Sequence, residues 1–197
     1  LVNSLKPAPP EHVLHAASQL RSRDLVTVTL MINRPRVTEH TWIYIPEKSI
    51  PFGRIHEPTN WSNSMAPPGK SLLVIEYFCF RGDKTWASED SDLVESTSQY
   101  LVELGIIKKQ DIIDQVVLRI PNAYPLFNVG YEEHCRTIYD YLSTFDNLYT
   151  AGRGGMFRYY NMDHAMQAGF DVAKLVTKQQ EEAKEASSVP FLSGVNI

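Results

Sequence analysis

The sequence predicts an α+β fold, in which an antiparallel β-sheet with flanking helices is followed by a strand, a glycine turn and a helix. Two observations predict this class. Residues 25–80 contain four apolar or alternating segments with short connections, which favours antiparallel pairing over parallel crossovers. Residues 148–176 then change from a short apolar run, through a glycine cluster, to helical periodicity. The composition, 43% hydrophobic and 21% charged, is that of a globular chain with a real core.

The predicted strands are rich in β-branched and aromatic residues and are bounded by proline or polar turns. They are residues 25–33, 42–45, 50–57 and 71–80. In the first, apolar residues alternate with threonines, so one face should lie on the core. Glu76 interrupts the last and most apolar strand. A carboxylate at such a position lies on the solvent face or is paired, and Arg54 on the neighbouring strand is the expected partner.

Helical spacing of apolar residues appears in three further segments. They are residues 11–20, 88–104 and 131–143. One more strand is predicted at the end of residues 111–119, with Pro121 and Pro125 marking its exit. The last residues, 185–197, carry no packing pattern, and we expect them to form a frayed tail.

Charge, cysteine content and hydropathy exclude several classes of function. The net charge of −4 argues against nucleic acid as a main partner, because such binding needs an excess of Lys and Arg. Cys79 and Cys135 are isolated in the sequence, so we expect two buried thiols in a reducing compartment, and a cytoplasmic protein. No apolar run approaches the roughly 18 residues of a membrane span. The six histidines show no metal-ligand spacing, so no metal site is predicted.

The glycine cluster after residue 151 is the main candidate for a binding site. Gly152, Gly154 and Gly155 can adopt positive φ and let a ligand approach the backbone. The helix expected from residue 161 onward would present unpaired N–H groups and a partial positive charge to that ligand. Arg153 adds a cation whose planar fork suits phosphate. On spacing alone, an ordinary strand-to-helix turn explains the cluster equally well.

The segment GRGGMFRYYNMDHAMQAG at residues 152–169 resembles the C-terminal flavin-binding signature of the amine oxidase, protoporphyrinogen oxidase and UDP-galactopyranose mutase superfamily of FAD proteins. The resemblance implies that the Gly-Arg pair meets the ribityl-diphosphate arm of FAD, and that a Met-Asp pair opens a helix aimed at the flavin ring. The cofactor-binding residues that it implies are Gly152, Arg153, Gly154, Gly155, Asn161, Met162 and Asp163.

A second match covers residues 51–57, PFGRIHE, which resemble a Thr-Arg-Ile-x-Glu strand of the mutase branch. The resemblance implies that Arg54 and Tyr159 bind the substrate. Two positions depart from the pattern, because Gly53 replaces the threonine and Asn161 stands where an aspartate is expected. An amide lacks the negative charge of a carboxylate, which weakens the case for mutase activity. His56, inside the motif, is expected to have an ordinary surface role.

The resemblance implies the C-terminal part of an FAD-dependent oxidoreductase of the protoporphyrinogen oxidase or amine oxidase type, with hydride transfer from a small-molecule substrate to flavin. No side-chain catalytic residue is assigned, since the flavin carries the chemistry. The predicted division is a substrate domain at 10–125, an FAD-binding segment at 126–184 and a tail at 185–197. The last segment would complete a Rossmann-like domain whose N-terminal half is absent.

Two alternatives remain open from the sequence. One is a UDP-galactopyranose mutase-like flavoenzyme. The other is a non-catalytic fragment or interaction module that binds no FAD by itself. The sequence contains no GxGxxG motif for the ADP half of the cofactor. We therefore expect a missing N-terminal FAD domain or a partner chain, and a homo-oligomer is a further option.

Overall fold

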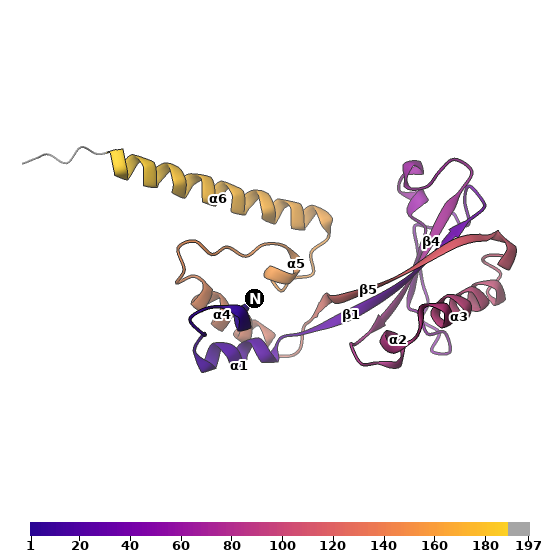
Figure 1. Cartoon of the computed structure of the whole chain (residues 1–197), viewed down its shortest axis with the longest axis horizontal. Coiled ribbons are helices and arrows are strands. Elements are labelled where there is room, and N and C mark those ends of the chain that lie inside the picture. The colour runs from indigo at the N-terminus through magenta and orange to yellow at the C-terminus, as the bar shows by residue number, and fades with distance from the viewer. Residues whose placement is uncertain (189–197) are drawn as a thin grey trace, which may run out of the picture. The chain divides into compact units, whose positions relative to one another are not determined.

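A computed structural model describes the backbone of residues 1–188 and the side chains of residues 1–181. The chain divides into two compact units, which are described separately. One unit consists of Ser22–Tyr124, and the other combines Leu1–Arg21 with the described residues from Pro125 onward. Figure 1 shows the elements of both. These are units of packing, and the functional division at residues 10–125, 126–184 and 185–197 stays a prediction.

The unit Ser22–Tyr124 is built on a five-stranded sheet with the order β2-β3-β4-β1-β5. The strands are β1 Arg21–Ile32, β2 Trp42–Tyr44, β3 Arg54–His56, β4 Ser71–Cys79 and β5 Ile112–Leu126. β1 pairs with β4, β4 with β3 and β3 with β2, all antiparallel. The predicted α+β class with an antiparallel sheet is therefore confirmed. In the register Arg54 lies opposite Glu76, so both side chains point to the same face.

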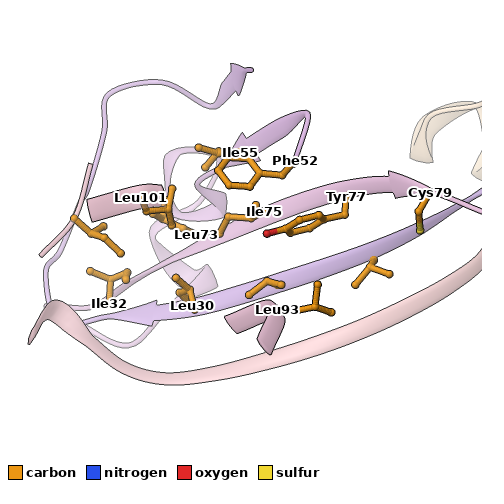
Figure 2. Close-up of a cluster of buried hydrophobic side chains, with 13 residues drawn as sticks. Leu30, Ile32, Phe52, Ile55, Leu73, Ile75, Tyr77, Cys79, Leu93 and Leu101 are labelled. Carbon is orange, nitrogen blue, oxygen red and sulfur yellow. The ribbon is translucent and has the colours of Figure 1, made fainter. Parts of the chain in front are cut away.

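One face of this sheet carries the core of the unit. Figure 2 shows apolar side chains of β1 and β4 meeting Leu93 and Leu101 of helix α3, Asp90–Glu103. The largest fully buried apolar side chains are Phe52, Leu30, Ile32, Ile55, Leu73, Ile75 and Leu101. Within this core the Tyr77 hydroxyl lies 2.6 Å from Oγ1 of Thr97, so the buried polar atoms satisfy each other. The short helix α2, Lys84–Ala87, precedes α3.

Two strands differ from their predictions. The threonines of β1 were expected to face solvent, but Thr27 and Thr29 are buried. β1 is an interior strand, and Thr27 pairs with Glu76 inside the polar cluster of the other sheet face. β5 continues through Pro121 and Pro125 instead of ending before them. It tolerates both prolines because it is the edge strand, where a missing N–H can face the open side.

In the other unit, α1 (Glu11–Gln19) packs against α4 (Tyr131–Leu142). Val13 and Ala16 of α1 are buried with Ile138 and Leu142 of α4. Cys135 on α4 is buried, as is Cys79 on β4, and both are free thiols. Burial raises the pKa of both thiols, so neither is poised to react as a thiolate.

The C-terminal part of this unit contains α5, Gly152–Gly155, and α6, Met162–Ser188. Residues 148–151 form no strand, although strand character was predicted. A strand needs a partner to satisfy its backbone groups, and the described residues of this unit provide none. Helix α6 continues through residues 185–188, the start of the predicted tail, and residues 189–197 lie outside the described part.

Four one-turn 3₁₀ helices complete the described elements. They are η1 Val2–Ser4, η2 Pro58–Asn60, η3 Asn63–Met65 and η4 Lys109–Asp111. Among the residues that the structure describes, none of the helices combines the length and apolarity needed to cross a membrane.

Candidate functional site

The predicted site residues fall into two clusters, one in each unit. The first lies on the sheet face opposite the core and centres on Arg54 of β3. Its guanidinium donates to Oε2 of Glu76 on β4, from Nε at 2.9 Å and from Nη2 at 2.6 Å. The expected Arg54–Glu76 pair is therefore confirmed. Nη2 also donates to the hydroxyl of Tyr124 on β5 at 3.0 Å.

Both members of this ion pair are held in their charged forms. Burial alone would raise the pKa of Glu76, whose side chain is 5% exposed, but contacts with His56 and Arg54 outweigh burial and lower it. Burial alone would lower the pKa of Arg54, whereas hydrogen bonds to Glu76 and Tyr44 raise it overall. The pair is thus a positioned cation and a positioned anion, and both side chains are mostly buried.

Aromatic rings surround the Arg54 guanidinium. Its central carbon lies 5.6 Å from the ring of Trp42, 5.8 Å from Tyr44 and 5.8 Å from Phe78. Rings at this distance stabilise a cation through their quadrupoles. Trp42 and Tyr44 belong to β2 and are exposed, so the cluster opens to solvent on that side.

The replacement of threonine by Gly53 has a physical reason in this cluster. A Cβ at Gly53 would approach the ring of Phe78 to 3.0 and 3.1 Å, which is tighter than most real Cβ contacts. The Phe78 ring lies close beside Gly53 and also faces Arg54. A side chain at position 53 would therefore require the Phe78 ring to shift by a few tenths of an ångström.

His56 is a member of this cluster that sequence reasoning missed. Its Nδ1 lies 3.2 Å from Oε1 of Glu76, the carboxylate oxygen that Arg54 does not use. Its ring is 5.4 Å from that of Trp61, which in turn lies edge-on to Trp42 at 5.1 Å. The available signal was strand periodicity, because residues two apart on β3 project to the same face as each other.

Glu57, the other residue of the matched motif, has a structural role. It is 1% exposed and accepts hydrogen bonds from the backbone amides of Val37 and Thr38, at 2.8 and 2.7 Å. The hydroxyl of Thr59 donates to it as well, at 3.2 Å. These donors satisfy the buried carboxylate, which ties the segment after β1 to the end of β3.

The second cluster surrounds α5 in the other unit. Gly152 has φ +71°, a conformation that favours glycine, and a Cβ at Gly152 or Gly154 would meet nothing within 4 Å. A Cβ at Gly155 would only touch Thr150, at 3.6 Å or more. The backbone of this turn is therefore open along one side, which fits the close approach of an extended cofactor arm.

Arg153 is directed at its own connector. It donates from Nε to the carbonyl oxygen of Tyr160 at 2.8 Å, and Nη2 donates to the same oxygen. Its guanidinium also lies over the ring of Tyr159, 4.9 Å from the centroid. Phe157, between them in the sequence, has φ +43° and packs against the rings of Phe127 and Tyr131. Arg153 thus closes the loop that leads into α6.

The first turn of α6 is largely exposed. Met162 is 86% exposed, and Asp163 Oδ1 lies 3.4 Å from Nδ1 of His164. The carbonyl oxygen of Asn161 accepts the amide of Ala165 at 3.0 Å and so begins the helix. Further along, Met166, Phe170 and Leu175 are also exposed. The structure brings Asn161, Met162 and Asp163 together with Arg153 around one connector, whereas Arg54 and Tyr159 belong to different units.

No protein-family model and no curated protein sequence matches the chain. Solved structures do. A reduced UDP-galactopyranose mutase matches with a TM-score of 0.70 and 22% identity, over 84% of this chain and 35% of the mutase. The chain shares its fold with part of that protein.

Two further structures carry the same fold. A protein from Exiguobacterium sp. assigned as a protoporphyrinogen oxidase matches with a TM-score of 0.64 and 16% identity, over 84% of this chain and 37% of that one. A putrescine oxidase triple mutant from a redesign of cofactor binding matches with a TM-score of 0.52 and 14% identity. The match covers 89% of this chain and 40% of the putrescine oxidase. All three names belong to the superfamily that the Gly152 segment resembles, so the resemblance is confirmed at the level of fold. The chain spans well under half the length of each.

Proposed function

We propose that the chain forms the C-terminal part of an FAD-dependent oxidoreductase, in which the flavin accepts a hydride from a small substrate. The observation that supports this most is the extent of the structural likeness. A single match to the mutase covers 84% of the chain, which is more than either unit alone supplies. The likeness therefore extends over parts of both units.

The residues around α5 fit the cofactor. FAD, when bound, supplies the electron acceptor. The open backbone at Gly152, Gly154 and Gly155 would admit its ribityl-diphosphate arm, and Arg153 would add positive charge beside it. The start of α6 at Asn161, Met162 and Asp163 would present helix N–H groups to the electron-rich edge of the flavin.

The sheet face around Arg54 would serve the substrate. Its fixed cation, held by Glu76 and surrounded by rings, suits an anionic or electron-rich group on a cyclic substrate. Because both charges are already positioned, binding need not reorganise them. Tyr159, 54% exposed, is the proposed substrate contact of the other unit.

A UDP-galactopyranose mutase-like activity is the second candidate. Arg54 and Arg153 favour it, since the guanidinium group suits phosphate, and the match with the highest TM-score of the three described above is a mutase. Asn161 opposes it, because an amide replaces the expected carboxylate.

The deciding experiment is the absorbance spectrum of the purified full-length protein. A flavin spectrum that bleaches when a porphyrinogen or an amine is added without oxygen would support the oxidase. Conversion of UDP-galactopyranose only after chemical reduction of the flavin would support the mutase instead. Absence of flavin, even after incubation with FAD, would overturn both proposals and leave an interaction module. Arg54→Ala should lower turnover and keep the flavin, with the exposed Arg36→Ala as the matched control.

A further inference from the structure

We propose that His56 contacts the substrate through Nε2 and accepts a proton from it, and that Glu76 is the residue that positions His56 for this role. This inference rests on the proposed function of the sheet face and assigns a proton acceptor within it. In the sequence motif, this position between Ile55 and Glu57 is unspecified.

The environment of the His56 Nδ1 atom indicates which ring nitrogen carries the proton. This atom is buried from solvent, and Oε1 of Glu76 lies 3.2 Å away. The contact is a close electrostatic one and not a well-aligned hydrogen bond. A buried carboxylate beside one ring nitrogen nevertheless favours the tautomer in which that nitrogen carries the proton. Neutral His56 would then have its lone pair on Nε2.

The two oxygens of the Glu76 carboxylate contact different partners. Arg54 donates to Oε2 of Glu76, whereas His56 lies against Oε1. The two cationic side chains therefore do not compete for one oxygen. Glu76 can neutralise Arg54 and still stabilise an imidazolium on His56, which is the arrangement that a proton acceptor needs.

The His56 ring is partly accessible to a ligand from solvent. The His56 side chain is 17% exposed, so part of the ring reaches the open face of the sheet. No hydrogen bond to Nε2 occurs within the described part of the chain, and imidazole geometry places this atom across the ring from Nδ1. The charged group in contact with the ring is Glu76 of β4. That carboxylate also holds Arg54 of β3, which in turn interacts with Tyr44 of β2 and Tyr124 of β5.

The neighbouring rings define the chemical class of ligand. Trp61 lies against His56, and Trp42 lies edge-on to Trp61, and both indoles are about half exposed. Exposed indoles bind flat or cyclic groups by stacking. The geometry points to a ring-bearing substrate with an O–H or N–H group beside the ring. When that bond breaks, its proton moves to Nε2, its electron pair stays on the substrate heteroatom, and the imidazolium is stabilised by Glu76.

The first test needs no bound cofactor or turnover. In protein labelled with ¹⁵N at histidine, long-range ¹H–¹⁵N spectra distinguish the two neutral tautomers, and His56→Gln assigns the signals. The expected result is an Nδ1-protonated His56 that changes toward the Nε2-protonated form in Glu76→Gln. An Nε2-protonated His56 in the unaltered protein would overturn the proposal.

The second test uses flavin-loaded full-length protein and a substrate that bleaches it. His56→Gln should lower kcat by about 100-fold or more and leave the flavin spectrum intact, since acid–base groups contribute on that order. In the same variant, the decrease of kcat/KM at low pH that protonation of the acceptor causes should disappear. His40→Gln, at an exposed histidine, is the matched control. Unchanged turnover in a flavin-loaded His56→Gln protein would reject His56 as acceptor, whereas failure of the unaltered protein to bind flavin would instead reject the proposed function.

Discussion

The carboxylate of Asp24 accepts the backbone amide of Asn122 at 2.8 Å, across 98 residues of sequence. Its other oxygen accepts the amide of Arg81 at 2.6 Å. Asp24 is buried, and Asn122 has φ +54°, which few residues other than glycine adopt readily. One side chain thus fixes the turn after β4 and the bend of β5 to the same point on β1.

Asp24→Ala should therefore lower the free energy of unfolding by about 2–4 kcal/mol, because two part-buried hydrogen bonds lose their charged acceptor. Urea denaturation followed by circular dichroism measures this. Asp114→Ala, which removes an exposed carboxylate from β5, should change stability by less than about 0.5 kcal/mol. Equal effects of the two substitutions would contradict the prediction.

Gly53→Ala should cost about 1–3 kcal/mol of stability, since the added methyl group forces the Phe78 ring to move. Thermal unfolding provides the measurement. The informative control is the double variant with Phe78→Leu, in which the smaller side chain leaves room for the methyl group. The double variant should be less destabilised than the sum of the two single variants. Simple additivity would show that Phe78 is not the obstacle.

Acid should weaken the protein partly through Glu76. Its pKa is lowered in the folded state, so its contribution to stability is complete above the unfolded pKa, near pH 4.3, and is lost as the pH falls through the lower folded value. Glu76→Gln should lose roughly 3–5 kcal/mol at neutral pH, because Arg54 is left buried without its partner. It should also flatten the fall in urea midpoint between pH 5 and 3. A curve parallel to that of the exposed control Glu39→Gln would contradict this assignment.

Arg153→Ala should weaken flavin retention in the full-length protein by about 10-fold or more, corresponding to about 1.5–3 kcal/mol for a charge-assisted contact. Either loss of a phosphate contact or release of the Tyr160 carbonyl would produce this effect. Dialysis followed by absorbance measures the retained flavin. Arg136→Ala on the exposed side of α4 is the control. Full flavin occupancy in the Arg153 variant would exclude both explanations.

The sheet and its best-defined polar pair followed from the sequence because both depend on local chemistry. Alternating β-branched residues and proline boundaries predicted β1 and β4, and an isolated carboxylate in an apolar strand indicated a partner such as Arg54. β5 was predicted too short, since proline is a weak stop signal on an edge strand, and edge position is a property of the assembled sheet.

The part of the site that could not be predicted depends on contacts between distant residues. Strand periodicity places His56 on the same sheet face as Arg54, but the contact of His56 with Glu76 arises only when β3 and β4 pair. Arg153 was predicted in a glycine turn, where the structure has the one-turn helix α5, and nothing in the sequence indicates that its side chain folds back onto Tyr160. Residues 148–151 were predicted as a strand from composition, while strand formation depends on a neighbour.

The edge-on contact between Trp42 and Trp61 makes the candidate site optically observable. The sequence contains three tryptophans, and these two lie together on the open sheet face, whereas Trp86 belongs to α2 and packs against the core. A ligand stacking on the face should alter the emission of this pair and leave that of Trp86 largely unchanged. Replacing Trp86 by phenylalanine would then give a protein whose intrinsic fluorescence reports binding directly, without a label.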